Sequence, residues 1–256
     1  MKVLYDDIGH NYDFTRSADE YISKRIISLI SASPDSSVLD IACGTGNYTV
    51  ALQNSGLRMT GVDISTEMLE TAEEKSQEVR WVKSDVSDLP FGDAVFDGCI
   101  CTLAIHHFAD IQKVFDEVYR VLKGGRFVIM TCSHRQIRNY WLYPYFPEAL
   151  EYMTTYIPDY EYVTSSLIKA GFAIRGVENY FITPSLTDNF LGSRIECPEV
   201  YLDPNFRGGI SLFARKAPSE TIDIGCRRLR ESIENNQINT SYRNPYGDYM
   251  FIIAEK

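Results

Sequence analysis

An aspartate and two glycines stand where an apolar run ends early in the chain. The run is VLDIACGTG at residues 38–46, with Asp40 inside it and Gly44 and Gly46 at its end. Glycines at the end of a strand let a ligand approach the main chain, because no Cβ stands in the way, and they tolerate a positive φ. Short Gly-x-Gly turns are also common in α/β folds. The stretch therefore predicts a ligand site only together with the segments that follow it.

The spacing of the glycines restricts the kind of ligand. A dinucleotide site needs Gly-x-Gly-x-x-Gly, and the position of the third glycine, counted from Gly44, is Thr49. A triphosphate loop needs a Lys followed by Ser or Thr, and residues 38–51 contain no Lys. A ligand at this turn is therefore not expected to be held by its phosphates.

Two more carboxylates follow predicted strands. Asp63 lies in MTGVDIS, seventeen residues after Gly46, and an acid at this place can accept hydrogen bonds from both hydroxyls of a ribose. The alternative is that Asp63 caps the next helix, although Ser65 can do so. Asp85, in VKSDVSDLPF, can accept from an adenine amino group, and Val86 adds a backbone N–H and an apolar wall. A turn aspartate remains the alternative for Asp85.

Two adjacent histidines end the next apolar run. FDGCICTLAIHHF, at residues 96–108, predicts a buried strand that runs into His106 and His107. Either imidazole can take a proton from an oxygen or nitrogen nucleophile, whereas a single histidine is more often structural. The chain has four His and no paired Cys spacing, and Cys99 and Cys101 share one face of a strand. We therefore expect no metal site.

The elements that position these residues alternate regularly. Short apolar runs predict strands at 38–42, 59–63, 79–83, 96–101 and 126–132. Continuous apolar strands separated by helices are typical of a parallel sheet that is covered on both faces, which is a doubly wound α/β fold. The later pattern predicts a helix near 162–170, a strand near 174–182 and a last strand in GDYMFIIAEK.

Two helices have recognisable ends. Ser17 and Glu20 have the spacing of a capping box, and the apolar residues after them share one helical face, namely Ile22, Ile26, Leu29 and Ile30. Asp110 can cap a helix over 111–122, which Gly124 or Gly125 can end.

Two stretches interrupt the alternation. Residues 134–160 contain many aromatic residues and three Pro without a clean period, and residues 185–247 are mixed and polar. We interpret both as insertions that cover a substrate, within a single domain of residues 1–256 whose core is 1–133. A helical turn would place Trp141 near Tyr145. The candidates for contact with substrate are Tyr140, Trp141, Tyr143 and Phe146, and ordinary packing of these aromatics is the alternative.

The composition restricts the class of protein to which the chain can belong. The chain has 256 residues, 45% hydrophobic and 23% charged, which suits one large α/β domain. A net charge of −10 argues against a general nucleic-acid binder, which needs a basic face. We find no apolar stretch of the roughly 18 to 20 residues that a membrane span needs, and no signal peptide. Six Cys in a chain of this length make no disulfide framework. We expect a reduced, cytoplasmic protein.

Five segments, in this order and spacing, resemble the successive motifs of class I S-adenosylmethionine-dependent methyltransferases, in particular the small-molecule type 11 branch. They are DIACGTGNYTVAL, GVDISTEML, SDVSDLPF, FDGCICTLAIHHF and VYRVLKGGRFVI. The opening YDDIGHNYDFTR also resembles the family's N-terminal segment, so the resemblance covers residues 1–135. It implies a mostly parallel, seven-stranded, Rossmann-like sheet with helical or irregular insertions, and S-adenosylmethionine as the cofactor.

The resemblance also implies which residues bind the cofactor. Asp63 would bind the ribose, Asp85 the adenine edge, and the backbone near Leu103 the methionine amino group. Asp40 would be tolerated inside a strand because a cationic, amine-bearing ligand lies beyond the strand's end. The full set implied is Tyr12, Arg16, Asp40, Ala42, Gly44, Gly46, Asp63, Ile64, Met68, Asp85, Val86 and Leu103.

These motifs predict methyl transfer to a small-molecule acceptor, in secondary or cofactor metabolism. A sulfonium methyl is already activated, so an in-line displacement needs alignment more than acid–base help, and the acceptor must be buried beside it. Two alternatives remain open: a non-catalytic S-adenosylmethionine-binding protein and an RNA methyltransferase. The acidic balance and the absence of an Asn-Pro-Pro-Tyr type signature weigh against RNA. The sequence does not specify the oligomeric state.

Overall fold

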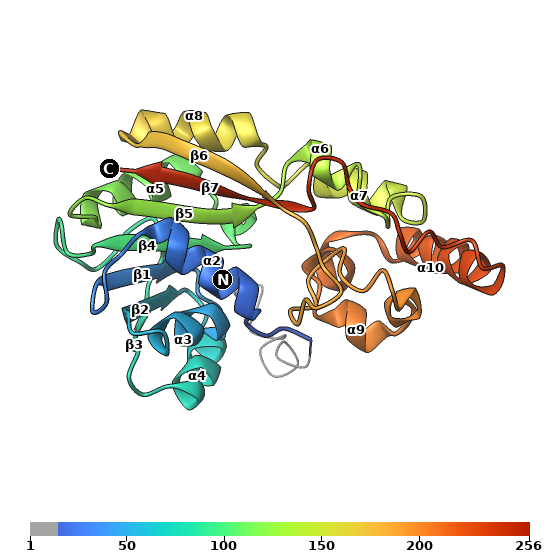
Figure 1. Ribbon diagram of the computed structural model, residues 1–256, viewed down its shortest axis with the longest axis horizontal. Coiled ribbons are helices and arrows are strands. Elements are labelled where there is room, and N and C mark those ends of the chain that lie inside the picture. The colour runs from blue at the N-terminus through green and yellow to red at the C-terminus, as the bar shows by residue number, and fades with distance from the viewer. Residues whose placement is uncertain (1–14) are drawn as a thin grey trace.

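A single seven-stranded sheet forms the body of the protein (Figure 1). The computed structural model describes residues 15–256, without the side chains of residues 215 and 216. The strand order is β3-β2-β1-β4-β5-β7-β6. β1 to β5 run parallel, and β7 is antiparallel to both of its neighbours. The strands are β1 (Ser37–Ile41), β2 (Arg58–Asp63), β3 (Arg80–Lys83), β4 (Gly98–Thr102), β5 (Arg126–Thr131), β6 (Ala173–Tyr180) and β7 (Tyr249–Glu255). The mostly parallel doubly wound fold is confirmed.

The order of the strands reverses at β1. The chain moves outward from β1 to β2 and β3, and then returns to place β4 on the other side of β1. In open α/β sheets, ligands bind beyond the carboxyl ends of the strands at such a reversal. Asp40 lies in β1 between Gly61 of β2 and Ile100 of β4, so the sheet carries a carboxylate to this place.

Helices cover both faces of the sheet. Ile22 and Ile26 of α2 (Glu20–Ile30) pack with Val38, Ile100 and Val128 in one buried cluster, to which α3 (Asn47–Gln53) also contributes. The other face packs against α5 (Ile111–Val121) and α8 (Tyr160–Ala170). α4 (Thr66–Lys75) lies against β2 and β3.

The helix ends test two sequence predictions. Asp110 caps α5, because its carboxylate accepts from the N–H groups of Gln112 and Lys113. The capping box of Ser17 and Glu20 was wrong. α2 begins at Glu20, and Asp19 is its N-cap. The Ser17 hydroxyl instead donates to the carbonyl of Thr187, which lies in the second insertion.

The two irregular stretches fold together into one helical cap, seen on the right of Figure 1. α10 packs against α7 so closely that a Cβ on Gly225 would lie 2.1 Å from the Phe146 ring. The insertions were expected to be helical or irregular, but the individual helices could not be located from the sequence because most are too short to show a period. They are α6 (His134–Ile137), α7 (Pro147–Met153), η2 (Pro198–Leu202), α9 (Pro204–Gly208), the π-helical turn η3 (Leu212–Lys216) and α10 (Ser219–Glu234).

Within residues 15–256, no helix combines the length and apolarity that crossing a bilayer requires. The same part of the chain contains no group of three or more His, Cys, Asp or Glu side chains placed to hold a metal ion. All six cysteines carry free thiols.

Candidate cofactor and acceptor site

A cavity of about 470 Å³ opens at the carboxyl ends of β1, β2 and β4. The structure brings most of the residues implied by the resemblance to its wall. Those that line it are Arg16, Asp40, Ala42, Gly44, Asp63, Ile64, Met68, Asp85, Val86 and Leu103, and the candidate base His107 lines it as well. Tyr12 lies outside the described residues.

The two glycines of the turn after β1 are required for different reasons. Both take a positive φ, 56° at Gly44 and 73° at Gly46. A Cβ on Gly44 would meet no atom within 4 Å, because this residue faces the cavity. A Cβ on Gly46 would instead lie 2.4 Å from the ring of Trp81. Gly44 therefore keeps space for a ligand, whereas Gly46 allows close packing beneath the turn and is not on the wall.

Asp63 organises the turn and faces the cavity. Its Oδ2 accepts from the Gly44 N–H at 2.8 Å, and its Oδ1 accepts from the Ser65 N–H at 2.9 Å. Burial raises the pKa of this carboxyl. Ser65 is the residue that caps α4, through its bond from the Met68 N–H. Since a carboxylate offers about four acceptor positions, Asp63 retains capacity to accept from a ligand hydroxyl.

Asp40 is a buried carboxylate. It is 3% exposed, and its Oδ2 accepts one side-chain hydrogen bond, from the hydroxyl of Thr49 at 2.6 Å. Burial raises the pKa of Asp40 to about 7, and the nearby charge of Asp63 adds to this rise. A cationic group in the cavity would favour the ionised form. The site is therefore suited to a ligand that carries positive charge.

Strained backbone marks two of the strand ends at the cavity. Ala42, after β1, and Leu103, after β4, take positive φ values of 53° and 55°. Such conformations cost non-glycine residues on the order of 1–3 kcal/mol and are concentrated at functional sites. Asp85 forms a local turn, since its Oδ1 accepts from both the N–H and the hydroxyl of Ser87. It still lines the cavity beside Val86.

An ion pair with a buried aspartate, which the sequence did not reveal, holds Arg16. The Arg16 Nε lies 2.5 Å from Asp188 Oδ1, and the Tyr48 hydroxyl donates to Asp188 Oδ2 at 3.0 Å. Asp188 is 1% exposed, and all three residues line the cavity. Asp188 stands 172 residues after Arg16 in a stretch without any motif. No sequence signal could have found it.

The two histidines lie at different cavities. His107 lines the cofactor-sized cavity, whereas His106 lines a second cavity of about 60 Å³. Arg16 and Leu103 line both cavities. The two imidazole rings are close, with 3.9 Å between their centroids.

The aromatic residues proposed for substrate contact are packed elsewhere. Tyr140, Trp141 and Phe146 are buried, and none of the four candidates, Tyr143 included, lines either cavity. The Trp141 indole donates to the Gly192 carbonyl at 2.7 Å. The ring centroids of Trp141 and Tyr145 lie 6.3 Å apart, as the four-residue spacing of these two side chains predicted. The structure favours packing over substrate contact for these side chains.

Known proteins share this fold and these motifs. A family model described as a methyltransferase domain matches residues 39–130. A solved structure from Anabaena variabilis, assigned as a methyltransferase of an antibiotic biosynthesis pathway, is 31% identical, with a TM-score of 0.84; the match covers 93% of this chain and 98% of that one. The chain belongs to the class I S-adenosylmethionine-dependent methyltransferases. The recognition of this family from its motifs is confirmed.

Two other proteins show how far the likeness extends. A demethylmenaquinone methyltransferase of Thermotoga maritima is 35% identical over 135 residues, which is 50% of this methyltransferase and 59% of the relative. The chain thus spans less than two thirds of that relative's length. The structure of the [4+2]-cyclase SpnF has a TM-score of 0.62 and 16% identity, covering 99% of this chain and 93% of that one. The cyclase shares the fold alone.

The cavity of this methyltransferase fits S-adenosylmethionine, the cofactor of the family. Asp63 can bind ribose hydroxyls, Asp85 an amino group, and Asp40 a cation, while the Thr102 hydroxyl on the same wall has no partner among the described residues. Arg16 lies where it can meet a carboxylate. When bound, the cofactor supplies a methyl group activated by its sulfonium.

Proposed function

We propose that the protein transfers the methyl group of S-adenosylmethionine to a small-molecule acceptor. The observation that carries the proposal is the convergence of Asp40, Asp63 and Asp85, from the ends of three neighbouring strands, on one cavity of about 470 Å³. This arrangement holds a nucleoside and an amino-acid cation by different carboxylates. The Gly44 turn leaves space for them, and the chain belongs to a methyltransferase family.

The helical cap supports a small acceptor. It packs over the end of the sheet and forms part of the wall of the second cavity beside the first. The protein's part in the reaction is to hold the acceptor in line with the methyl group and away from water, and such positioning supplies about 7–11 kcal/mol. The Thermotoga relative acts, by its name, on demethylmenaquinone, and the Anabaena protein is assigned to antibiotic biosynthesis. Both support a role in secondary or cofactor metabolism, in a reducing cytoplasm that suits six free thiols.

The test is turnover of labelled cofactor. Purified protein is incubated with methyl-labelled S-adenosylmethionine and either small-molecule extracts or tRNA. We expect S-adenosylhomocysteine to form together with label in the small-molecule fraction. Binding of the cofactor without any product would favour a non-catalytic binding protein or a different reaction, which the cyclase shows the fold can carry.

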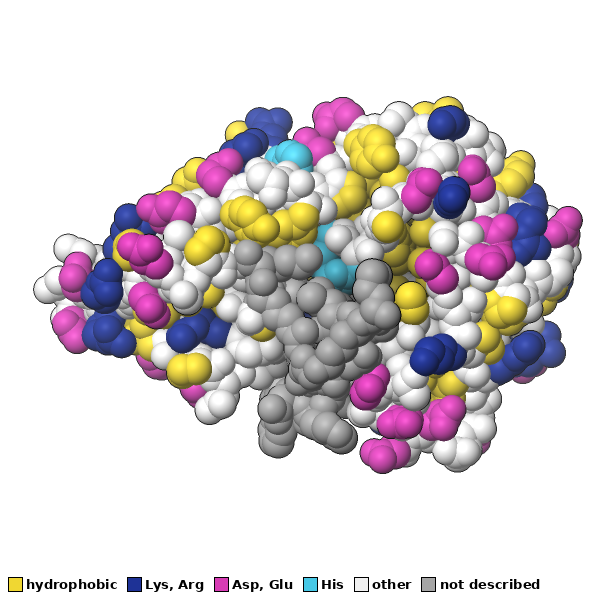
Figure 2. All heavy atoms as spheres, turned by 180° about the vertical axis from the view of Figure 1, so that it is seen from behind, with side chains coloured by type: hydrophobic (Ala, Val, Ile, Leu, Met, Phe, Trp, Pro, Cys, Tyr) yellow, Lys and Arg dark blue, Asp and Glu magenta, His cyan; other side chains and the backbone are white. Residues whose placement is uncertain are grey.

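An RNA acceptor is the weaker alternative. Figure 2 shows acidic and basic side chains interspersed over one face of the molecule, rather than a continuous basic stripe, and the net charge is −10. Label recovered in tRNA, with salt-dependent binding, would overturn the small-molecule proposal.

A further inference from the structure

We propose that Glu117 and Arg120 of α5 set the base specificity of the cofactor site, because together they hold the loop after β3 where its Asp85 can meet the amino group of adenine. This inference rests on the methyltransferase function proposed above. Neither Glu117 nor Arg120 lines the cofactor cavity. Both are therefore positioning residues, which act on the cofactor through Asp85.

The loop that carries Asp85 has no helix or strand of its own over residues 84–97. Its first N–H, from Ser84, donates to the Asp63 carbonyl at the end of β2, at 3.0 Å. The next residues form a tight turn, in which the Ser87 N–H donates to Asp85 Oδ1 at 2.9 Å. Such a turn fixes its own shape but not its direction, so contacts beyond it must decide where the Asp85 carboxylate points.

Glu117 and Arg120 supply those contacts. Glu117 Oε2 accepts from the Leu89 N–H at 2.8 Å, and the Leu89 carbonyl accepts from Arg120 Nη2 at 3.1 Å. Arg120 Nη1 also donates to the Phe91 carbonyl at 2.7 Å and to Asp93 Oδ1 at 2.9 Å. The loop is thus bound, just after the turn, at three positions to two side chains of one helix.

The two side chains also hold each other. Arg120 Nε and Nη2 both donate to the Glu117 carboxylate, each at 2.8 Å. These bonds lower the pKa of Glu117, because Arg120 stabilises its ionised form. A bidentate pair of this kind has a defined geometry, and its planar guanidinium fork has no equivalent in lysine. Glu117 and Arg120 therefore form one rigid unit, which we call the α5 clamp.

Apolar packing and the α5 clamp have different effects on the loop. Val86, Leu89 and Phe91 are buried in the same cluster as Phe115 and Val118 of α5. Such packing is non-directional, so it holds the loop against the helix without fixing its position along the helix. The hydrogen bonds of the α5 clamp are directional, and they determine which residues of the loop lie at the cavity.

The chemistry of the base makes the direction of Asp85 matter. An ionised carboxylate only accepts hydrogen bonds, so it can bind the exocyclic amino group of adenine. Purine, which has a hydrogen in place of that amino group, leaves the carboxylate without this donor. A site built to bind an N–H group rejects the analogue that lacks it, provided that the acceptor is well placed. A displaced Asp85 should therefore weaken binding of the adenine cofactor more than binding of its purine analogue.

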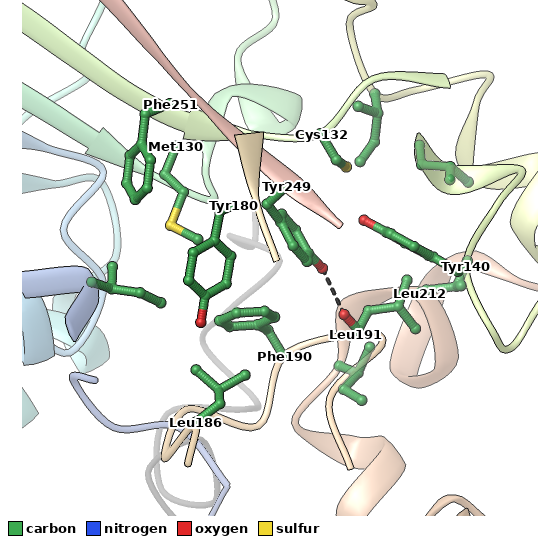
Figure 3. Close-up of a cluster of buried hydrophobic side chains, with 14 of the residues drawn as sticks. Met130, Cys132, Tyr140, Tyr180, Leu186, Phe190, Leu191, Leu212, Tyr249 and Phe251 are labelled. Carbon is green, nitrogen blue, oxygen red and sulfur yellow. Dashed lines mark hydrogen bonds between the residues drawn. The ribbon is translucent and has the colours of Figure 1, made fainter. Parts of the chain in front are cut away.

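The cap is held to the sheet by a separate set of contacts. Figure 3 shows Tyr180, Phe190 and Tyr249 packed together between the strand ends and the cap, where the Tyr249 hydroxyl donates to the Leu191 carbonyl at 2.8 Å. These residues belong to one buried cluster, whereas α5 packs in the other. Substitutions in the α5 clamp are therefore expected to leave the cap in place.

The test compares the affinity of the full-length protein for S-adenosylhomocysteine and for its 6-deamino analogue, in which purine replaces adenine. Titration calorimetry gives the ratio of the two dissociation constants. We expect the wild type to prefer the adenine compound about tenfold or more, and Arg120→Gln to lose most of this preference. Arg120→Lys keeps the charge without the fork, so its ratio should lie between those two values. It carries the comparison if Arg120→Gln does not fold.

Two controls separate base specificity from stability. Arg126, like Arg120, is 32% exposed. It bonds the carboxylate of Glu255 and, at 2.9 Å, the carbonyl of Leu29, at the amino end of β5 and away from the cavity. Arg126→Gln should lower the unfolding temperature as Arg120→Gln does, but keep the wild-type ratio. In Asp85→Ala the ratio should already be low, and adding Arg120→Gln should not lower it further.

The possible failures are distinguishable. A ratio that stays at the wild-type value in Arg120→Gln and Arg120→Lys, or that falls equally in Arg126→Gln, would overturn the role of the α5 clamp. A further fall when Arg120→Gln is added to Asp85→Ala would overturn its action through Asp85. A wild type that binds both compounds equally well would overturn selection of the base by this loop. Failure of the wild type to bind S-adenosylhomocysteine would instead refute the proposed methyltransferase function.

Discussion

At the scale of single residues, the ionisation of Asp40 links cofactor binding to pH. Burial raises the pKa of this carboxyl to about 7 in the free protein, and a cationic ligand favours its ionised form. Below pH 7, binding must therefore release a proton. We expect the affinity for S-adenosylmethionine to fall on the order of tenfold between about pH 7.5 and 5.5. Calorimetry in two buffers of different ionisation heat measures the released proton.

The control for this linkage is Asp40→Asn. The amide does not titrate, so the affinity of the variant should vary much less over the same range. A rise in pH has opposite effects on the two properties: it increases the affinity for the cofactor but decreases the stability of the free protein. Because the folded pKa lies above the unfolded value of 3.8, Asp40 makes the free protein less stable as pH rises from about 4 to 7. Equal pH dependence of binding in wild type and variant would show that another group is responsible.

Asp63 has a structural role beside the ribose-binding role that we propose, although it is not the cap of α4, which is Ser65. Asp63→Ala removes the ribose acceptor and also frees the N–H groups of Gly44 and Ser65. We expect a loss of about 1.5–3 kcal/mol in cofactor binding, or about ten- to a hundredfold in affinity, together with a lower unfolding temperature. Titration calorimetry and thermal unfolding measure the two effects.

Ser65→Ala is the matched comparison for Asp63. It removes the N-cap of α4, which costs about 1 kcal/mol of stability, without touching a ligand acceptor. Its affinity should therefore stay near that of the wild type. If Asp63→Ala behaves in the same way, Asp63 is only a structural residue of the turn.

At the scale of elements, the segment around Asp188 joins the cap to the chain just before α2. Asp188 bonds Arg16, and its neighbours Thr187 and Asn189 bond Asp19 and Thr15. Asp188→Asn removes the buried negative charge that pairs with the 13% exposed Arg16 side chain, which should cost on the order of 3 kcal/mol of stability and weaken cofactor binding. Denaturant unfolding and cofactor titration measure these losses.

A second ion pair provides the contrast for Asp188. Arg25 and Glu178 join α2 to β6, with both side chains 33% exposed. Because exposed pairs contribute about 0–1 kcal/mol, Glu178→Gln should change stability little and cofactor affinity not at all. Equal effects of the two substitutions would contradict a special role for Asp188.

The packing of residues 134–150 makes a prediction about its motion. Tyr140, Trp141 and Phe146 are buried, and the N–H groups of Tyr143 and Phe146 are bonded to Tyr140 and Leu142 carbonyls. We therefore expect slow amide exchange for much of this stretch with or without ligand. Rapid exchange in the free protein that slows with S-adenosylhomocysteine would instead support the cover interpretation of this segment.

At the scale of the whole molecule, the cofactor should stabilise the folded state by mass action. A ligand at a hundred times its Kd adds about 2.7 kcal/mol. We expect S-adenosylmethionine and S-adenosylhomocysteine to raise the unfolding temperature, and NAD and ATP to leave it nearly unchanged, because the glycine turn lacks the spacing for their phosphates. A comparable shift with NAD would contradict the cofactor assignment.

Local patterns in the sequence were enough to predict the sheet and to bring three of its carboxylates to one cavity. The strands β1 to β5 begin and end within two residues of the predicted runs, because buried parallel strands read as continuous apolar segments. Asp40, Asp63 and Asp85 could be placed together because each follows or lies in such a strand, and parallel strands bring their carboxyl ends to one edge.

Only the tertiary structure decided the parts that depend on contacts between distant segments. Asp188 reaches Arg16 through the cap, and α7 and α10 meet at Phe146 and Gly225; neither contact has a local pattern. The sequence also could not separate His106 from His107, because they are adjacent and of one type. The 3₁₀ turn η1 (Ile105–His107), anchored by the buried Ile105, separates them in space, since side-chain direction follows from backbone conformation and burial and not from the order of residues.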